Sequence, residues 1–284
     1  MLTYITASLP ILGWGFMPII ANLRKSSPVE QLLGTAIFAF IFSIITSLIM
    51  KPEITLFSFT VSFISGIFWS IGQLFQFKAI QLSSVSKIMP LSNGSQLIFI
   101  SFTSVLLFRE WTNSKMYIIG TLSIIMIVIG ILCTNYQQTK SDESKKYNSY
   151  GWTLLSSLFL MLYVLTNQLF SIEGYQIILP QSVGMLIASS IIYLHYFEGS
   201  FSFSNLNYNL ITGFSWSIAN LGMFLTTIQL GVATSFSISQ SCVIVATLGG
   251  VFFFKEKKTR KEWLFILLGI VLIMGGVFSL GTLK

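Results

Sequence analysis

The sequence is poor in charged residues and in the side chains that build reactive sites. Asp, Glu, Lys and Arg together make up 9% of the 284 residues, beside one histidine and two cysteines. A soluble domain carries roughly 25% charged residues, so this chain cannot cover a water-facing surface. Asp142 is the one aspartate, and Cys133 and Cys242 lie inside apolar runs, which leaves no nucleophile–base set and no metal-ligand cluster. We therefore predict no enzymatic activity, no cofactor and no metal site.

Long apolar runs are what the chain has instead. Hydrophobic residues make up 54% of the sequence, and ten runs of about 20 residues are each long enough to cross ~30 Å of hydrocarbon as a helix. The runs are continuous rather than alternating, which favours helices over barrel strands. We predict an all-α polytopic membrane protein whose ten transmembrane helices cover residues 2–23, 31–50, 56–80, 85–108, 115–134, 150–172, 176–196, 208–230, 233–254 and 263–282.

The positive charge of the chain is unevenly distributed between its loops. A net charge of +7 would suggest nucleic acid in a soluble protein, but cytoplasmic loops of membrane proteins carry an excess of Lys and Arg. When the helices are numbered alternately, most of the basic residues fall on one side of the membrane. We therefore predict that loops 24–25, 135–149 and 255–262 are cytoplasmic, that both termini lie outside, and that the lipid bilayer rather than nucleic acid surrounds the chain.

One polar stretch divides the chain into two halves. Residues 135–149 (NYQQTKSDESKKYNS) have the composition of a solvated linker, so the predicted units are a first five-helix repeat at 1–134 and a second at 150–284. Because five is an odd number of crossings, the first half ends on the opposite side of the membrane from where it began. The second half therefore enters the membrane from that opposite side. We therefore predict two inverted repeats, which alternate between outward-open and inward-open states around a central site.

The two halves also share sequence. The segment Ile64–Ile71 reads again at Ile211–Ile218, with the same Ile, Gly, Trp, Ser and Ile. In a chain this apolar, a repeated half-length unit is typical of a secondary transporter. The other matches are Gln73 with Asn220, Val85 with Val232, Ser92 with Ser239, Asn93 with Gln240 and, one residue out of register, Arg109-Glu110 with Lys255-Glu256.

Uncharged polar side chains gather inside the predicted helices. An amide or hydroxyl in hydrocarbon costs a few kcal/mol without a partner, so such groups face the bundle interior or a cavity. Trp69, Gln73 and Gln76 share one helix face. Amides can bind the hydroxyls of a sugar while an indole stacks on its C–H face. The predicted substrate-binding residues are Trp69, Gln73, Asn93, Gln96, Trp216, Asn220 and Gln240.

The remaining features of the sequence restrict the class of ligand and predict a gate. Pro90 removes a backbone donor and Gly94 loosens the same helix, so we predict a gating helix break at these two residues. A lipophilic cation needs a carboxylate at mid-membrane, and the glutamates lie at helix ends or in loops. A phosphorylated solute needs a deep basic residue, and Lys78 and Lys87 lie near helix ends, where lysines snorkel. A neutral polyol fits this site.

Short motifs are spread along nearly the whole chain. They are Gly13–Gly15, Leu33–Thr35, Phe77–Ile80, Ser86–Ser92, Gln96-Leu97, Glu110-Trp111, Leu179–Gln181, Gly184-Met185, Ser239-Gln240, Ala246–Gly250 and Lys255–Thr259. Together these motifs resemble the glucose/ribose porter family of the drug/metabolite transporter superfamily. The resemblance implies a ten-helix fold of two inverted halves and proton-coupled uptake of a monosaccharide by bacterial cells. Glu110-Trp111 and Lys255–Lys258 favour the glucose members, whereas Arg109 stands where a glycine is more usual.

The leading hypothesis is therefore a monosaccharide uptake permease, with glucose as substrate, working by alternating access. Ribose uptake and export of drugs or metabolites are the alternatives, and a sensor would bind sugar without moving it. Without a buried carboxylate, proton coupling would have to use a helix-end residue such as Glu110 or Glu256, or His195, so facilitated diffusion is also open.

Overall fold

The computed structural model describes residues 2–283 except 109–110, 139–142, 173, 200–201, 231–234 and 236–237. The described part is all-helical, with ten helices and no strand. This confirms the predicted fold class. The helices are α1 (Leu2–Leu23), α2 (Pro28–Met50), α3 (Leu56–Leu82), α4 (Val85–Phe108), α5 (Ser114–Thr134), α6 (Glu143–Leu169), α7 (Tyr175–Tyr196), α8 (Phe203–Leu230), α10 (Cys242–Phe253) and α11 (Arg260–Gly281).

Seven of the described helices are long and apolar enough to cross a membrane. They are α1, α2, α3, α5, α6, α7 and α11. Large apolar side chains on their outer faces are exposed, as the 70% exposure of Leu48 and the 83% exposure of Leu194 show. Such faces are stable against lipid and not against water. The chain is therefore a multi-pass membrane protein.

Residues in the polar connections cap the N-termini of three helices. The helices α2, α3 and α11 each begin at a capping box, in which the N-cap residue and the third residue of the helix satisfy each other's backbone N–H groups. The N-caps are Ser27, Thr55 and Thr259. Each of these helices therefore begins with its free backbone donors paired within the protein.

Two elements differ from the predicted ranges. The helix α6 begins at Glu143, so its first turns lie in the segment predicted as a linker. Polar residues such as Glu and Lys are good helix formers, and a polar composition does not prevent a helix outside the membrane. In the run predicted as a helix at 233–254, α10 begins at Cys242. Ile238 and Ser239 before it are also helical, and a turn at Gln240–Ser241 separates them from α10.

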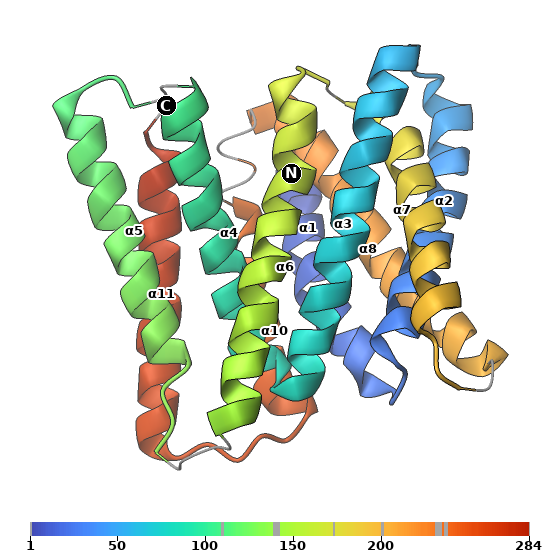
Figure 1. The fold of residues 1–284 in the computed structure, drawn as a ribbon. Helices are drawn as coiled ribbons and strands as arrows, with labels where there is room; N and C mark the ends of the chain where they lie inside the picture. Colours follow the sequence, from blue (N-terminus) through green and yellow to red (C-terminus); the bar gives the residue numbers. More distant parts are fainter. Residues whose placement is uncertain are drawn as a thin grey trace.

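Helices of the first half pack mainly against helices of the second. The helix α3 packs against α6 and α7, and α8 packs against α1 and α2. The helices α4 and α10 contact each other. Further contacts join α4 to α6 and α10 to α1. Figure 1 shows the paired helices α5 and α11 at one edge of the bundle and the paired helices α2 and α7 at the other. When the helices of the two halves are matched in order, α1 corresponds to α6 and α3 to α8. The pair α3–α6 then corresponds to the pair α8–α1.

Glycines allow two of these crossings to be very close. A Cβ on Gly66 of α3 would overlap the carbonyl oxygen of Gln181 in α7. At the repeat-related position in α8, a Cβ on Gly213 would lie 2.7 Å from the carbonyl oxygen of Thr35 in α2. Small residues at such places let helix backbones approach in a membrane, where no hydrophobic force drives them together. The helices that carry Trp69 and Trp216 are thus fixed against α7 and α2.

We predict that Gly66→Ala destabilises the protein by about 1–3 kcal/mol, since the new methyl must push α3 away from α7. Gly151→Ala is the matched control, because nothing lies within 4 Å of a Cβ at that exposed helical position. Thermal unfolding of the purified protein in detergent measures both. A melting temperature for Gly66→Ala equal to that of Gly151→Ala would contradict the close crossing.

Candidate functional site

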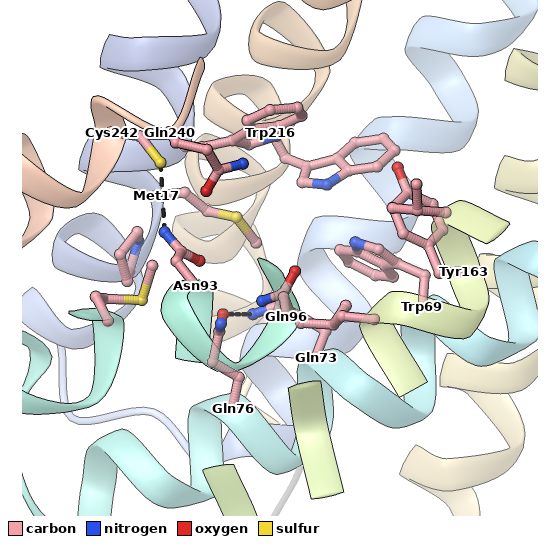
Figure 2. Close-up of a pocket in the computed structure, with 15 residues that line it drawn as sticks. Met17, Trp69, Gln73, Gln76, Asn93, Gln96, Tyr163, Trp216, Gln240 and Cys242 are labelled. Atoms are coloured by element: carbon pink, nitrogen blue, oxygen red, sulfur yellow. Dashed lines mark hydrogen bonds between the residues drawn. The ribbon is translucent and has the colours of Figure 1, made fainter. Parts of the chain in front are cut away.

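A cavity of about 100 Å³ lies between α1, α3, α4, α6, α8 and the start of α10 (Figure 2). One water needs roughly 10–15 Å³ on this scale, so the cavity has room for several water-sized groups. The described residues that line it are all uncharged, and amides and aromatic rings dominate its polar character. They are Trp14, Met17, Pro18, Trp69, Gln73, Gln76, Met89, Asn93, Gln96, Leu160, Tyr163, Val164, Trp216, Gln240 and Cys242.

One wall of the cavity is a hydrogen-bonded row of amides from α3 and α4. The Nε2 of Gln73 donates to the Oε1 of Gln76 at 2.8 Å. Ser92 Oγ then accepts from the Nε2 of Gln76 at 2.8 Å and from the Nε2 of Gln96 at 3.2 Å. Spacings of three and four residues put each pair on one helix face. The row thus holds α3 and α4 in register beside the cavity.

This row leaves acceptors facing the cavity. The amide nitrogens of Gln73 and Gln96 are used within the row, while their Oε1 atoms accept no hydrogen bond from the described residues. Both side chains line the cavity, and Gln73 is only 4% exposed. Each oxygen is free to accept a hydrogen bond from a group bound in the cavity. The wall is therefore suited to a ligand that donates hydrogen bonds, as sugar hydroxyls do.

The opposite wall is built by the other half of the chain. Asn93 of α4 reaches across the cavity, and its Nδ2 donates to the Sγ of Cys242 at 3.5 Å. Gln240 lies in the turn that precedes α10 and is 8% exposed. The turn leaves this amide outside a regular helix and directed at the cavity (Figure 2). Amides from both halves thus face the same space.

Two indoles close the cavity where α3 and α8 meet. The rings of Trp69 and Trp216 lie 5.2 Å apart between centroids and cross edge to face at 61°. Both are buried, at 2% and 6% exposure. Figure 2 shows them side by side, with Tyr163 of α6 next to them. Aromatic faces beside amides provide flat apolar contact and hydrogen bonds in one small site, which is the chemistry of a polyol site.

The sequence model of the family described as sugar transport protein matches residues 5–283. The chain belongs to the sugar transport protein family. It is 58% identical to a Listeria monocytogenes protein provisionally named a sugar uptake protein, over 99% of each chain. It is 36% identical to the glucose uptake protein GlcU of Bacillus subtilis, over 98% of this chain and 97% of the other. A crystal structure with 12% identity superposes with a TM-score of 0.67 over 98% and 96% of the chains, which shows the fold alone.

In this sugar transport protein, six of the seven residues predicted to bind substrate line the central cavity: Trp69, Gln73, Asn93, Gln96, Trp216 and Gln240. The seventh, Asn220, lies elsewhere. It lines a separate hole of about 10 Å³ together with Ala39, Ser217 and one side of Trp216. That hole has room for about one water. The repeat placed Gln73 and Asn220 at matching positions, but the two halves pack differently around them.

Both residues of the predicted gating break lie inside a helix of this family member, and their role in gating stays a prediction. The helix α4 runs from Val85 to Phe108 and includes both Pro90 and Gly94. A Cβ on Gly94 would lie 2.5 Å from the Cδ1 of Ile131 in α5, so this glycine serves a helix contact and does not line the cavity. The irregular backbone beside the cavity lies instead at Gln240–Ser241.

Sequence reasoning left several lining residues out of the predicted site. Gln76 was placed on the right face by its spacing from Trp69 and Gln73, and it joins the amide row. Tyr163 had no such signal, because aromatic residues are common throughout the apolar runs of this chain. Its position at the cavity follows from how α6 packs against α3, which a single sequence does not reveal.

Other polar residues of the helices hold the bundle together. The Oδ1 of Asn167 accepts from Ser62 at 2.9 Å, and its Nδ2 donates to Ser65 at 2.9 Å, which joins α6 to α3. Gln181 of α7 donates to the same Ser65 at 3.0 Å. Lys78 lies over the ring of Trp152, with its Nζ 5.3 Å from the centroid. These side chains have protein partners and do not line the cavity.

Proposed function

We propose that this protein takes up a monosaccharide, with glucose as its substrate. The cavity that carries this proposal offers two amide oxygens with no donor among the described residues, the amide of Gln240 on the facing wall, and two buried indoles. Its described lining has no charged side chain, so neither a cationic drug nor a sugar phosphate finds a counter-ion there. The relative named as a glucose uptake protein supports glucose over ribose.

We further propose that the two halves are inverted repeats and that transport proceeds by alternating access. Packing supports this, since exchanging the halves relates the pairs α3–α6 and α3–α7 to α8–α1 and α8–α2. The cavity lies between α1, α3, α6 and α8, and α4 and the start of α10 also line it. Two states of such a bundle can expose one central site to each face of the membrane in turn.

The helix α4 is the element that we propose moves, with Pro90 as its point of flexure. Proline has no N–H, so the carbonyl of Ser86 loses its usual partner within the helix. Gly94 lies one turn further, in contact with Ile131 of α5, and permits α4 to shift along that neighbour without a side chain in the way. The turn at Gln240–Ser241 gives α10 the same freedom in the second half.

The proposed substrate site predicts different outcomes for two repeat-related amides. In proteoliposomes, radiolabelled glucose should exchange with internal unlabelled glucose. Gln73→Ala should raise the KM for glucose about tenfold, since each lost hydrogen bond to a ligand is of order 1–2 kcal/mol. Asn220→Ala is the matched control and should leave the KM near the wild-type value, because Asn220 lies outside the cavity.

The same counterflow experiment is run with ribose. Exchange of ribose but not of glucose would show that ribose is the substrate. No exchange of either sugar, or a larger effect from Asn220→Ala than from Gln73→Ala, would contradict the proposed site.

We propose that uptake is coupled to protons, as the resemblance implies. Because no carboxylate lines the described cavity, the coupled proton would bind at a helix end, and Glu256 beside α4 is the candidate. Glucose added to cells that express the protein should make the unbuffered medium more alkaline, and Glu256→Gln should abolish this alkalinisation. Uptake without any pH change, and without inhibition by a protonophore, would show facilitated diffusion instead.

A further inference from the structure

A partly buried carboxylate joins the two halves at the end of the bundle where α10 connects to α11. The hydroxyl of Ser86, at the start of α4, points at both carboxylate oxygens of Glu256, at 2.9 and 2.7 Å. The Nζ of Lys258 pairs with the same carboxylate at 2.9 Å. Ser86 is 2% exposed, and the side chains of Lys258 and Glu256 are 8% and 16% exposed. We call these three side chains the latch.

The backbone after α10 is shaped to place this carboxylate. The helix α10 ends at Phe253, and Lys255 adopts the left-handed region at φ 51°. This reversal returns the chain, so that the N–H of Glu256 donates to the carbonyl of Val251 at 3.0 Å. A positive φ is strained for a side chain such as lysine and persists where surrounding contacts maintain it. The latch provides contacts that do so.

The helices that the latch joins lie in close contact here. A Cβ on Gly250 of α10 would lie 2.8 Å from the backbone N of Ser86. Glu256 thus places its charge at the N-terminus of α4, where the backbone N–H groups and the helix dipole favour an anion. The interaction combines a charge-assisted hydrogen bond, an ion pair and a helix end, and it is largely screened from water.

The first turn of α4 is weakly attached to the rest of its own helix. Pro90 has no N–H to give to the carbonyl of Ser86, so the helical ladder lacks one bond at this point. Beyond the proline, α4 carries Asn93 and Gln96, which line the cavity. What holds Ser86 therefore also determines how α4 lies beside α10 and how open the cavity is at this end.

We propose that Glu256 is a positioning residue for transport, and that the latch keeps the cavity closed at the end of the bundle formed by residues 254–259. The role of the latch in transport rests on the proposed alternating access. When Ser86 leaves Glu256, the first turn of α4 moves away from α10 about Pro90. The cavity then opens toward this end. A helix cap that only stabilises the fold would not control access from one side.

The test uses the accessibility of Cys242, which lines the cavity. In a Cys133→Ser background Cys242 is the only cysteine, and no sugar is added. A membrane-impermeant maleimide is applied to inside-out and to right-side-out vesicles, and the rate of alkylation is measured from each face. The variants are Ser86→Ala and Glu256→Gln, with Ser86→Thr as the conservative rescue that keeps the hydroxyl. Glu198→Gln is the charge control, an exposed carboxylate in the α7–α8 connection.

Ser86→Ala and Glu256→Gln should raise the alkylation rate about tenfold from the face that carries residues 254–259, and not from the other face. A hydrogen bond to a charged group is of a strength that shifts an opening equilibrium by this factor. Ser86→Thr and Glu198→Gln should match the parent. Unchanged rates in both latch variants would overturn the proposal. Equal increases from both faces would overturn it as well, since they indicate general loosening of a structural cap.

The failure of this proposal is distinct from failure of the proposed function. Alkylation is measured without sugar, so a chain that transports another solute would still show the one-sided increase. Loss of that increase with intact glucose counterflow would leave the substrate assignment in place and remove the latch alone.

Discussion

A polar side chain in the hydrocarbon of a membrane must find its partner within the protein, because the lipid offers none. This constraint organises the helices of this sugar transport protein. Hydroxyls such as those of Thr35 and Thr153 bond back to the carbonyl one turn earlier, and Ser65 joins α3 to α6 and α7 through Asn167 and Gln181. Apolar faces are left outward and polar groups inward. Pairing is incomplete at a few buried positions, such as the Oε1 of Gln31, and also at the cavity, where the oxygens of Gln73 and Gln96 have no donor among the described residues.

The incomplete pairing is what a sugar can complete. Gln73 and Gln96 use their amide nitrogens within the row that leads to Ser92, and their oxygens face the cavity without a donor. A sugar hydroxyl supplies that donor, and the indoles of Trp69 and Trp216 supply flat apolar contact. A ligand with hydroxyls and C–H faces therefore fits the cavity better than an ion. The family of the chain agrees with this chemistry.

Much of the fold was predictable from the sequence, since continuous apolar runs of membrane length have few alternatives to helices. The predicted range 2–23 matches α1, and 85–108 matches α4. The exceptions are local. A continuous helix at 233–254 was expected because its composition is apolar, yet the turn at Gln240–Ser241 depends on tertiary contacts. The start of α6 at Glu143 shows that a polar segment can still be helical.

The candidate site was predictable where one helix determined it, and less so where two halves had to be placed together. Helical spacing put Trp69, Gln73 and Gln76 on one face, and all three line the cavity. The repeat, taken as symmetric, put Asn220 beside them, but α8 turns that amide to the far side of Trp216. The two halves therefore differ in the polar groups that they present at matching positions of the sequence repeat. Such differences arise from side-chain packing, which the repeat pattern does not encode.

The central claim is that the cavity beside Trp69 and Trp216 is the sugar site. Protection of Cys242 from alkylation tests it most directly, because this thiol lines the cavity while Cys133 in α5 lies outside it. Saturating glucose, at about ten times its Kd, should slow alkylation of Cys242 roughly tenfold by occupancy and leave Cys133 unaffected. An unchanged rate at Cys242, at glucose concentrations that support counterflow, would contradict the claim.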